Sequence, residues 1–169
     1  MREGIPSEVK HLQISYFHYI LSLDEYKYIL CDSLNYCVEK KALEIFCFAL
    51  MSTHLHLIAR AKNYNLSDVV RDFKKYTSGK LINEIRFGDE DRKENMLNTF
   101  HSGGKKQKKK SNYQIWQYNN HAVEVYSPQF TLSRVNYIHY NPVEAGLVTI
   151  PDHIDPPIPV HVDPSLLEK

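Results

Sequence analysis

The order of apolar and polar residues at the start of the chain predicts a strand followed by a helix. From residue 9 to 17, apolar positions partly alternate with polar ones, as in a strand with one buried face. Asp24 is an acceptable N-cap for a helix that ends near Lys40 and Lys41. Apolar residues recur within this helix at steps of three and four, the spacing of one helix face: Tyr26, Ile29, Leu30, Leu34, Cys37 and Val38.

The next apolar segments predict a hairpin in the middle of a sheet. Residues 43–51 carry apolar side chains on both faces, as a central strand does when it is covered. Ser52 and Thr53 supply a turn, and residues 54–59 return to alternation. Two strands joined by so short a turn pair with each other antiparallel.

A long amphipathic helix is predicted after the hairpin. Asn65 or Ser67 can cap it. Its apolar face consists of Leu66, Val69, Val70, Phe73, Thr77, Leu81 and Ile85. Cationic residues are among those at the remaining positions: Arg71, Lys74, Lys75 and Lys80. The outer face of this helix is therefore expected to be basic.

The last part of the domain has weaker patterns. Residues 87–112 are charged, contain glycine and show no period, which predicts a long loop. Residues 113–117 suit an edge strand, and residues 130–140 suit a short helix that ends before Pro142. Gly146 is expected in the turn that follows that helix.

Length and composition describe an ordinary globular domain. The chain has 169 residues, 43% of them hydrophobic, so a core can form without a disulfide or a structural zinc. Its 3 cysteines form no Cys-x-x-Cys pair and are expected to be reduced thiols. The longest apolar run, residues 45–51, is far shorter than the ~20 residues that cross a bilayer. No apolar segment follows Met1, so we expect a cytoplasmic protein without a membrane span.

The net charge of +1 hides an uneven distribution. Residues 150–169 hold five of the 8 prolines, four acids and one base. Removing them from 21 bases and 20 acids leaves 20 bases and 16 acids, a formal +4, over residues 1–149. We therefore expect one folded domain over residues 1–149 and a proline-rich tail over residues 150–169 that forms an extended arm without a core of its own.

A run of lysines follows Gly104 and predicts a flexible cationic loop: Lys105, Lys106, Lys108, Lys109 and Lys110. A loop of this kind can simply be solvated and aid solubility. Alternatively, basic loops combined with exposed aromatic rings hold single strands of nucleic acid, and the chain has 12 Tyr and 7 Phe.

His54 and His56 are the first candidates for chemistry. Side chains two residues apart in a strand point the same way, so both imidazoles face one side of the sheet while Leu55 and Leu57 face the other. Two neutral imidazoles so placed suit a divalent metal ion. The alternative is a pair of half-exposed or core histidines that bind nothing, and the motif alone does not decide between the two.

Tyr137 and Asn141 lie one turn apart on the predicted helix and so share a face. A phenol beside an amide oxygen suits metal-assisted phosphoryl transfer, with the tyrosine as nucleophile and the asparagine as a metal ligand. The alternative is that Tyr137 and Tyr140 pack on the sheet while Asn141 ends the helix before Pro142. Tyr76 is a rival nucleophile, although its place near the apolar face predicts core packing.

Four segments in this order resemble one family of enzymes, the single-tyrosine transposases of the HUH superfamily, and within it the REP-associated tyrosine transposases. That family is named for a His-hydrophobic-His motif, which His54-Leu55-His56 matches. The resemblance covers residues 24–148, and the segments that carry it are residues 51–58, 66–78, 115–117 and 137–148.

The resemblance implies a fold, a site and a reaction. The implied fold is an α+β, ferredoxin-like sandwich, a central antiparallel sheet with helices packed on one face, usually in a homodimer. By match to the family's motifs, Tyr137 is the nucleophile, and Asn141 joins His54 and His56 in holding Mg²⁺ or Mn²⁺. The implied reaction is the cleavage and rejoining of single-stranded or hairpin DNA through a 5′-phosphotyrosine intermediate.

We expect the DNA backbone to contact Arg71, Lys74, Lys75, Lys105, Lys106 and Lys108. Two other functions stay open. A non-catalytic or domesticated nucleic-acid-binding protein on the same fold would keep these basic surfaces but form no covalent adduct. A metal-dependent hydrolase that uses water as its nucleophile would stay active when Tyr137 is replaced by Phe.

Overall fold

The computed structural model describes residues 9–15, 20–62, 65–88, 91–105, 113–147 and 161–162. These residues form five strands, four α-helices and a short 3-10 helix at Ile20–Ser22. The strands are β1 (Lys10–Ser15), β2 (Leu43–Leu50), β3 (His54–Ala61), β4 (Val123–Glu124) and β5 (His161–Val162). The helices are α1 (Asp24–Lys41), α2 (Leu66–Phe87), α3 (Lys93–Lys105) and α4 (Pro128–Glu144).

The described strands form one antiparallel sheet in the order β4-β1-β3-β2-β5. β3 lies at the centre because its hairpin partner β2 and the N-terminal β1 pair with its two edges. The register places Gln13 opposite His56 and Ser15 opposite His54. A β-bulge between Ile45 and Cys47 shifts the register of β2. The predicted N-terminal strand and central hairpin are confirmed.

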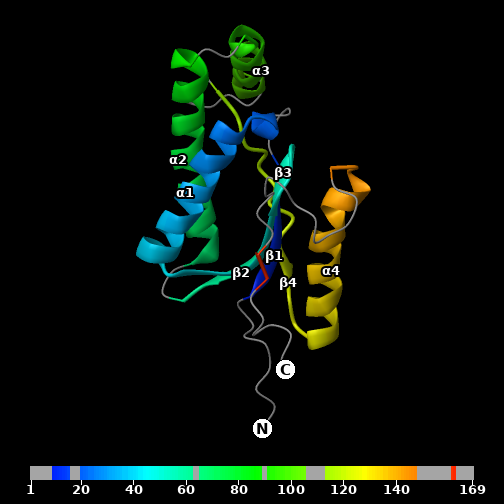
Figure 1. The fold of residues 1–169 in the computed structure, drawn as a ribbon. Helices are drawn as coiled ribbons and strands as arrows, with labels where there is room; N and C mark the ends of the chain where they lie inside the picture. Colours follow the sequence, from blue (N-terminus) through cyan, green and yellow to red (C-terminus); the bar gives the residue numbers. More distant parts are fainter. Residues whose placement is uncertain are drawn as a thin grey trace.

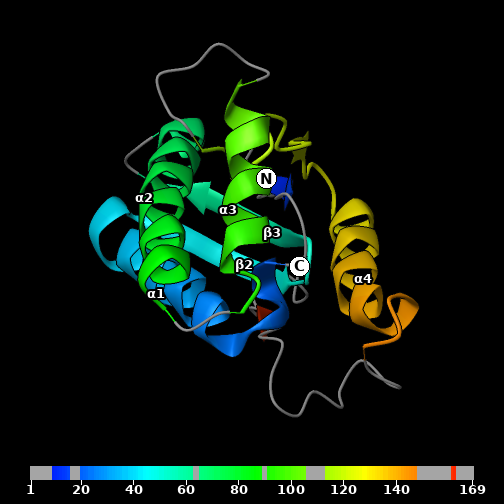
Figure 2. The ribbon, with the colours of Figure 1, turned by 90° about the horizontal axis from the view of Figure 1, so that it is seen from above.

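Helices cover both faces of the sheet. α1 and α2 lie side by side on one face, and α4 lies on the opposite face (Figures 1 and 2). The main core, which includes Leu30, Leu57 and Leu81, is buried beneath α1 and α2. A smaller core that includes Ile58 and Ile138 is buried beneath α4. The predicted α+β, ferredoxin-like sandwich is confirmed. The prediction placed helices on one face of the sheet, where α1 and α2 lie, and it did not include α4 on the opposite face.

Two residues of the proline-rich tail extend the sheet. His161 and Val162 form β5, which pairs with Phe48 and Cys47 at the outer edge of β2. The other residues of the predicted arm lie outside the described part of the chain, so the division at residue 149 stays a prediction. None of the described helices is both long and apolar enough to cross a membrane.

The two predicted helix starts differ in how they are capped. The side chain of Asn65 accepts a hydrogen bond from the backbone N–H of Ser67 at 2.8 Å, so Asn65 is the N-cap of α2 as predicted. Asp24, in contrast, lies within the first turn of α1, after an N-cap at Leu23 that makes no side-chain bond. The Asp24 carboxylate pairs instead with Lys27 at 2.6 Å, so the prediction of Asp24 as a cap is wrong.

A helix, α3, forms within residues 87–112, where the charge and the glycines predicted a long loop. Its apolar face is short: Phe100 is fully buried, and Met96 and Leu97 pack against the main core beside it. Three apolar residues at helical spacing suffice because α3 has to cover only the end of α2. The loop prediction is therefore wrong over Lys93–Lys105.

The segment from residue 113 to 117 is not an edge strand, apart from one isolated bridge at Trp116. Its indole is buried and donates a hydrogen bond to the hydroxyl of Thr77 at 3.0 Å, which ties the segment to α2. The edge of β1 is taken by β4 instead, where Val123 and Glu124 pair with His11 and Lys10. The requirement to bury the indole and bond its N–H outweighs the weak strand pattern.

α4 continues through Pro142 to Glu144, so the predicted end before the proline is wrong. A proline costs most in the middle of a helix, where it removes a hydrogen bond and crowds the preceding turn. Here the ring is buried and only two helical residues follow it. Gly146 then adopts φ 68°, a left-handed conformation that favours glycine, which confirms the predicted turn.

Replacing Thr77 with Val should destabilise the fold by about 1–3 kcal/mol, because the buried indole N–H of Trp116 loses the acceptor that Thr77 supplies. Urea unfolding of wild type, Thr77→Val, Trp116→Phe and the double variant measures the effect as a double-mutant cycle. The cost of Thr77→Val should be smaller by about 1 kcal/mol in the Trp116→Phe background. Equal costs in both backgrounds would contradict the assigned role of this hydrogen bond.

Candidate functional site

Strand alternation in β3 directs His54 and His56 to the face covered by α4, while Leu55 and Leu57 join the main core on the other face. The two imidazole centroids are 4.6 Å apart, and the rings are nearly perpendicular. His54 is half-buried, whereas His56 is 0% exposed. Any ligand therefore reaches His54 from solvent more readily than it reaches His56.

α4 places Tyr137 and Asn141 over the two imidazoles. The Oδ1 of Asn141 lies 3.3 Å from Nε2 of His54. The phenol ring of Tyr137 meets His56 edge to face, with 5.3 Å between the centroids, and remains 40% exposed. Four side chains that the sequence pattern singled out in two distant segments thus lie together. Asn141 does not end the helix, because α4 continues beyond it.

A third imidazole, which the sequence pattern did not single out, completes this group of side chains. His11 of β1 is buried, and its Nε2 lies 3.3 Å from Nδ1 of His56. The ring of Tyr137 also packs edge-on against His11, with 6.2 Å between the centroids. The available signal was the position of His11 on the polar face of the predicted first strand, but only the pairing of β1 with β3 brings it to His56.

Burial keeps all three imidazoles neutral at pH 7. Desolvation, together with the charge of Arg134, lowers the pKa of His11 from 6.5 to about 4. Desolvation and the two neighbouring histidines lower the pKa of His56 to about 3. Desolvation also lowers the pKa of His54, and its hydrogen bond with Asn141 opposes that change. Neutral imidazoles keep a lone pair for a metal ion or for a hydrogen bond.

The donor atoms fit a small divalent cation. Nε2 of His56 is buried and makes no hydrogen bond, although the Asn141 amide lies close enough to both imidazoles to affect their pKa values. The 3.3 Å between Nε2 of His54 and Oδ1 of Asn141 is close to the roughly 3 Å between neighbouring ligands in an octahedral Mg²⁺ site. Among the described residues, no three His, Cys, Asp or Glu side chains form a metal site by themselves, so a metal ion held here would take the Asn141 amide as its third protein ligand.

The predicted DNA contacts on α2 lie on the other side of the sheet from the histidines. Arg71, Lys74 and Lys75 line a groove of about 750 Å³ between α2 and the segment 113–120. Arg71 forms ion pairs with Asp68 and Asp72, and Lys74 donates to the side chain of Asn120 at 2.7 Å. Lys75 is exposed. Lys105 ends α3, and the side chains of Lys105, Lys106 and Lys108 lie outside the described part of the structure.

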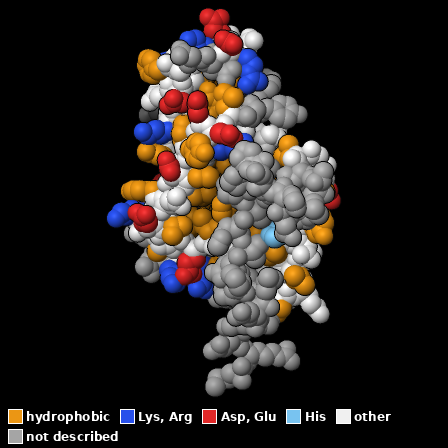
Figure 3. Space-filling view, viewed as in Figure 1, with side chains coloured by type: hydrophobic (Ala, Val, Ile, Leu, Met, Phe, Trp, Pro, Cys, Tyr) orange, Lys and Arg blue, Asp and Glu red, His pale blue; other side chains and the backbone are white. Residues whose placement is uncertain are grey.

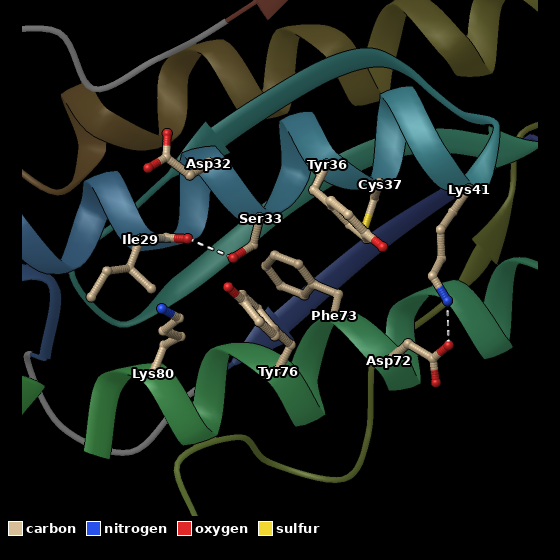
Figure 4. Close-up of a pocket in the computed structure, with 10 residues that line it drawn as sticks. All are labelled: Ile29, Asp32, Ser33, Tyr36, Cys37, Lys41, Asp72, Phe73, Tyr76 and Lys80. Atoms are coloured by element: carbon tan, nitrogen blue, oxygen red, sulfur yellow. Dashed lines mark hydrogen bonds and ion pairs between the residues drawn. The ribbon is translucent and has the colours of Figure 1, made fainter. Parts of the chain in front are cut away.

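Tyr76 is neither buried nor near the histidines. It is 57% exposed on α2, so the prediction that it packs in the core is wrong. Tyr76 and Phe73 of α2 approach Tyr36 of α1 across a groove of about 570 Å³, one end of which is closed by an ion pair between Lys41 and Asp72 (Figure 4). Hydrophobic side chains lie among charged ones on this side of the molecule (Figure 3).

Comparison with known proteins gives a likeness of fold. No family model and no curated protein matches the chain. Among solved structures, the chain is similar to a REP-associated tyrosine transposase bound to a REP hairpin, with a TM-score of 0.58 and 18% sequence identity. The match covers 88% of this chain and 74% of that chain. At this identity the comparison shows that the two proteins share a fold.

Acid should destabilise the protein through its buried histidines. A histidine with a pKa of about 4 when folded and about 6.5 when unfolded binds protons more readily in the unfolded state. Its contribution to stability is therefore complete above pH 6.5 and is lost as the pH falls towards 4. Between pH 7 and pH 5 this loss is on the order of 2 kcal/mol for one such group.

Urea unfolding in the presence of a chelator, at several pH values from 7 to 5, measures this effect. His11→Gln should lose less stability over that range than wild type. His121→Asn is the control, because His121 is exposed and its positive φ of 42° suits Asn. If His11→Gln and wild type lose the same amount, the buried His11 does not cause the acid sensitivity.

Proposed function

We propose that this protein is a metal-dependent DNA transposase of the single-tyrosine HUH type, which cleaves and rejoins single-stranded or hairpin DNA. The observation that carries the proposal is the gathering of His54, His56, Tyr137 and Asn141 from β3 and α4 at one place. The likeness in fold to a tyrosine transposase bound to a hairpin supports it.

Tyr137 is the proposed nucleophile. Its phenol oxygen forms a bond to the phosphorus of the scissile phosphate as the bond from that phosphorus to the 3′ oxygen breaks. The phenol loses its proton to solvent, and the departing 3′ oxygen takes up a proton to become a hydroxyl. The product is a 5′-phosphotyrosine, and attack by another 3′-hydroxyl reverses the step. The 40% exposure of Tyr137 lets a phosphate approach it.

His54, His56 and Asn141 would hold the Mg²⁺ or Mn²⁺ ion. When bound, this ion would draw charge from the scissile phosphate and orient it. One of these ligands has a hydrogen-bond partner on its other ring nitrogen. The hydroxyl of Thr53 lies 3.0 Å from Nδ1 of His54 and so restricts the rotation of that ring. Because His56 is fully buried, the phosphate would approach from the side of His54, Asn141 and Tyr137.

Arg71, Lys74 and Lys75 are proposed to hold the DNA backbone in the groove beside α2, together with the lysine loop after Gly104. The groove and the histidines lie on different faces, but the segment 113–120 runs along the edge between them. The N–H of Gln117 donates to the carbonyl of Ser15 at 2.9 Å, and Ser15 lies opposite His54. A single strand could therefore pass round this edge from the groove to Tyr137.

A homodimer is part of the proposal. One chain supplies one nucleophile, whereas strand transfer between two DNA ends uses two covalent attachments at once. Two copies of the site would meet that need.

We also propose that the protein acts in the cytoplasm, where the DNA of a cell without a nucleus is found.

A second candidate function is a non-catalytic or domesticated protein that binds single-stranded nucleic acid on the same fold. The complete burial of His56 favours it, as does the direct contact between His54 and Asn141, which lets these side chains satisfy each other. This protein would keep the basic groove and would form no covalent adduct.

An adduct assay separates the two functions. Incubation of wild type with a labelled pool of single-stranded hairpins of varied sequence and Mn²⁺ should give a protein–DNA band that survives denaturation. Tyr137→Phe should give no band, because phenylalanine has no oxygen to attack the phosphate, and excess chelator should abolish the band of wild type. Tyr140→Phe, at the exposed tyrosine one position before Asn141, and Tyr76→Phe are matched controls that should retain the band.

A band that persists in Tyr137→Phe and disappears in Tyr140→Phe or Tyr76→Phe would assign the nucleophile to the other tyrosine. Binding of the pool by wild type without any adduct, across the whole range of hairpins, would favour the non-catalytic function.

The proposed groove predicts a local effect of charge on binding. Lys75→Ala should weaken binding of single-stranded DNA by roughly 3- to 10-fold near 0.1 M salt and should reduce the slope of log affinity against log salt by roughly 0.7, the value for one lost phosphate contact. Fluorescence anisotropy over a range of salt concentrations measures both quantities. Lys40→Ala removes the same charge from an exposed position near the end of α1, outside the groove, and should change them little. Equal effects of the two substitutions would argue against the groove.

A further inference from the structure

His11 and His56 are joined end to end through their ring nitrogens. Nε2 of His11 lies 3.3 Å from Nδ1 of His56, and the planes of the two rings differ by 23°. A ring nitrogen lies about 1.1 Å from the centre of its imidazole, so two collinear rings with this contact have centres about 5.5 Å apart. The observed separation is 5.5 Å. The contact is therefore an in-plane N–H···N hydrogen bond, and the two rings do not stack face to face.

At 3.3 Å the two ring nitrogens can share one proton in an N–H···N hydrogen bond, so one ring donates it and the other accepts it. If His11 donates it, His56 must carry its own proton on Nε2, and that buried N–H has no acceptor. If His56 donates it, Nε2 of His56 keeps its lone pair. The second arrangement avoids a buried N–H without an acceptor at Nε2 of His56, and buried N–H groups without an acceptor are rare in folded proteins.

We propose that His11 is a positioning residue: its Nε2 accepts the Nδ1–H of His56 and thereby holds His56 in the tautomer whose Nε2 lone pair is available between His54, Asn141 and Tyr137. A histidine that binds a metal ion usually donates its other N–H to a fixed acceptor, which sets the tautomer and the orientation of the ring. Thr53 can do the same for His54. The expected effect of His11 on metal binding by His56 rests on the proposed function, whereas the assignment of the His56 tautomer does not.

The tautomer can be read without metal. Long-range ¹H–¹⁵N correlation spectra of the chelator-treated protein at pH 7 distinguish protonated from unprotonated ring nitrogens. We expect His56 to carry its proton on Nδ1 and His11 to have an unprotonated Nε2. In His11→Leu, which cannot accept a hydrogen bond, His56 should shift towards the Nε2–H form. A wild-type spectrum in which His56 is protonated on Nε2 would overturn the proposal.

Metal affinity supplies a second readout. Titration of Mn²⁺ followed by calorimetry should show binding weaker by about 10- to 100-fold in His11→Leu than in wild type, the usual range for loss of such a partner. His11→Gln retains an acceptor oxygen and should stay within about 3-fold of wild type. Gln13→Leu is the matched control, because Gln13 follows on the same face of β1 and lies directly opposite His56. It should also stay near wild-type affinity.

The outcomes separate this proposal from the proposed function. Equal Mn²⁺ affinity in wild type and His11→Leu, or an equal loss in Gln13→Leu, would overturn the role of His11 in positioning. If wild type binds no Mn²⁺, the metal-dependent function fails, and the spectrum of wild type alone decides the tautomer. If His11→Leu does not fold, the comparison of His11→Gln with wild type and the wild-type spectrum still test the proposal.

Discussion

The two-residue repeat of side chains along β3 is the constraint on which the rest of this molecule depends. It directs Leu55 and Leu57 into the main core, and the burial of these leucines makes a shift of register costly. The same alternation requires the side chains of His54 and His56 to point to the opposite face of the sheet. The imidazoles are presented to α4 because the strand is held by its apolar side, and the hydrophobic core thereby positions the polar site.

Presenting imidazoles to a covering helix has an electrostatic consequence. His56 and His11 are buried together, so each can remain only in its neutral form near pH 7, and each needs a partner for its ring nitrogens. The contact between them satisfies one nitrogen of each ring. Nε2 of His56 remains without a bond, beside Asn141 and under the ring of Tyr137. In the proposed function, this nitrogen is where the metal ion would bind.

The sheet also separates two surfaces that the proposed function would use together. Imidazoles, phenol and amide lie under α4, whereas the basic groove lies beside α2 on the opposite face. The segment 113–120 connects the two, because it is tied to α2 through the indole of Trp116 and to the edge of β1 through Gln117. Its irregular backbone, which the pattern of residues 113–117 did not predict, is what allows it to bridge the layers.

Periodicity along the chain determined most of this protein: the N-terminal strand, the central hairpin, the helices α1, α2 and most of α4, the shared face of His54 and His56, and the one-turn spacing of Tyr137 and Asn141. These features depend on neighbours in sequence. Tertiary structure alone decided that α4 lies over the imidazoles, that it continues through Pro142, that α3 forms and that His11 reaches His56. Each of these depends on burial against residues far along the chain or on the register between strands, and neither leaves a local pattern.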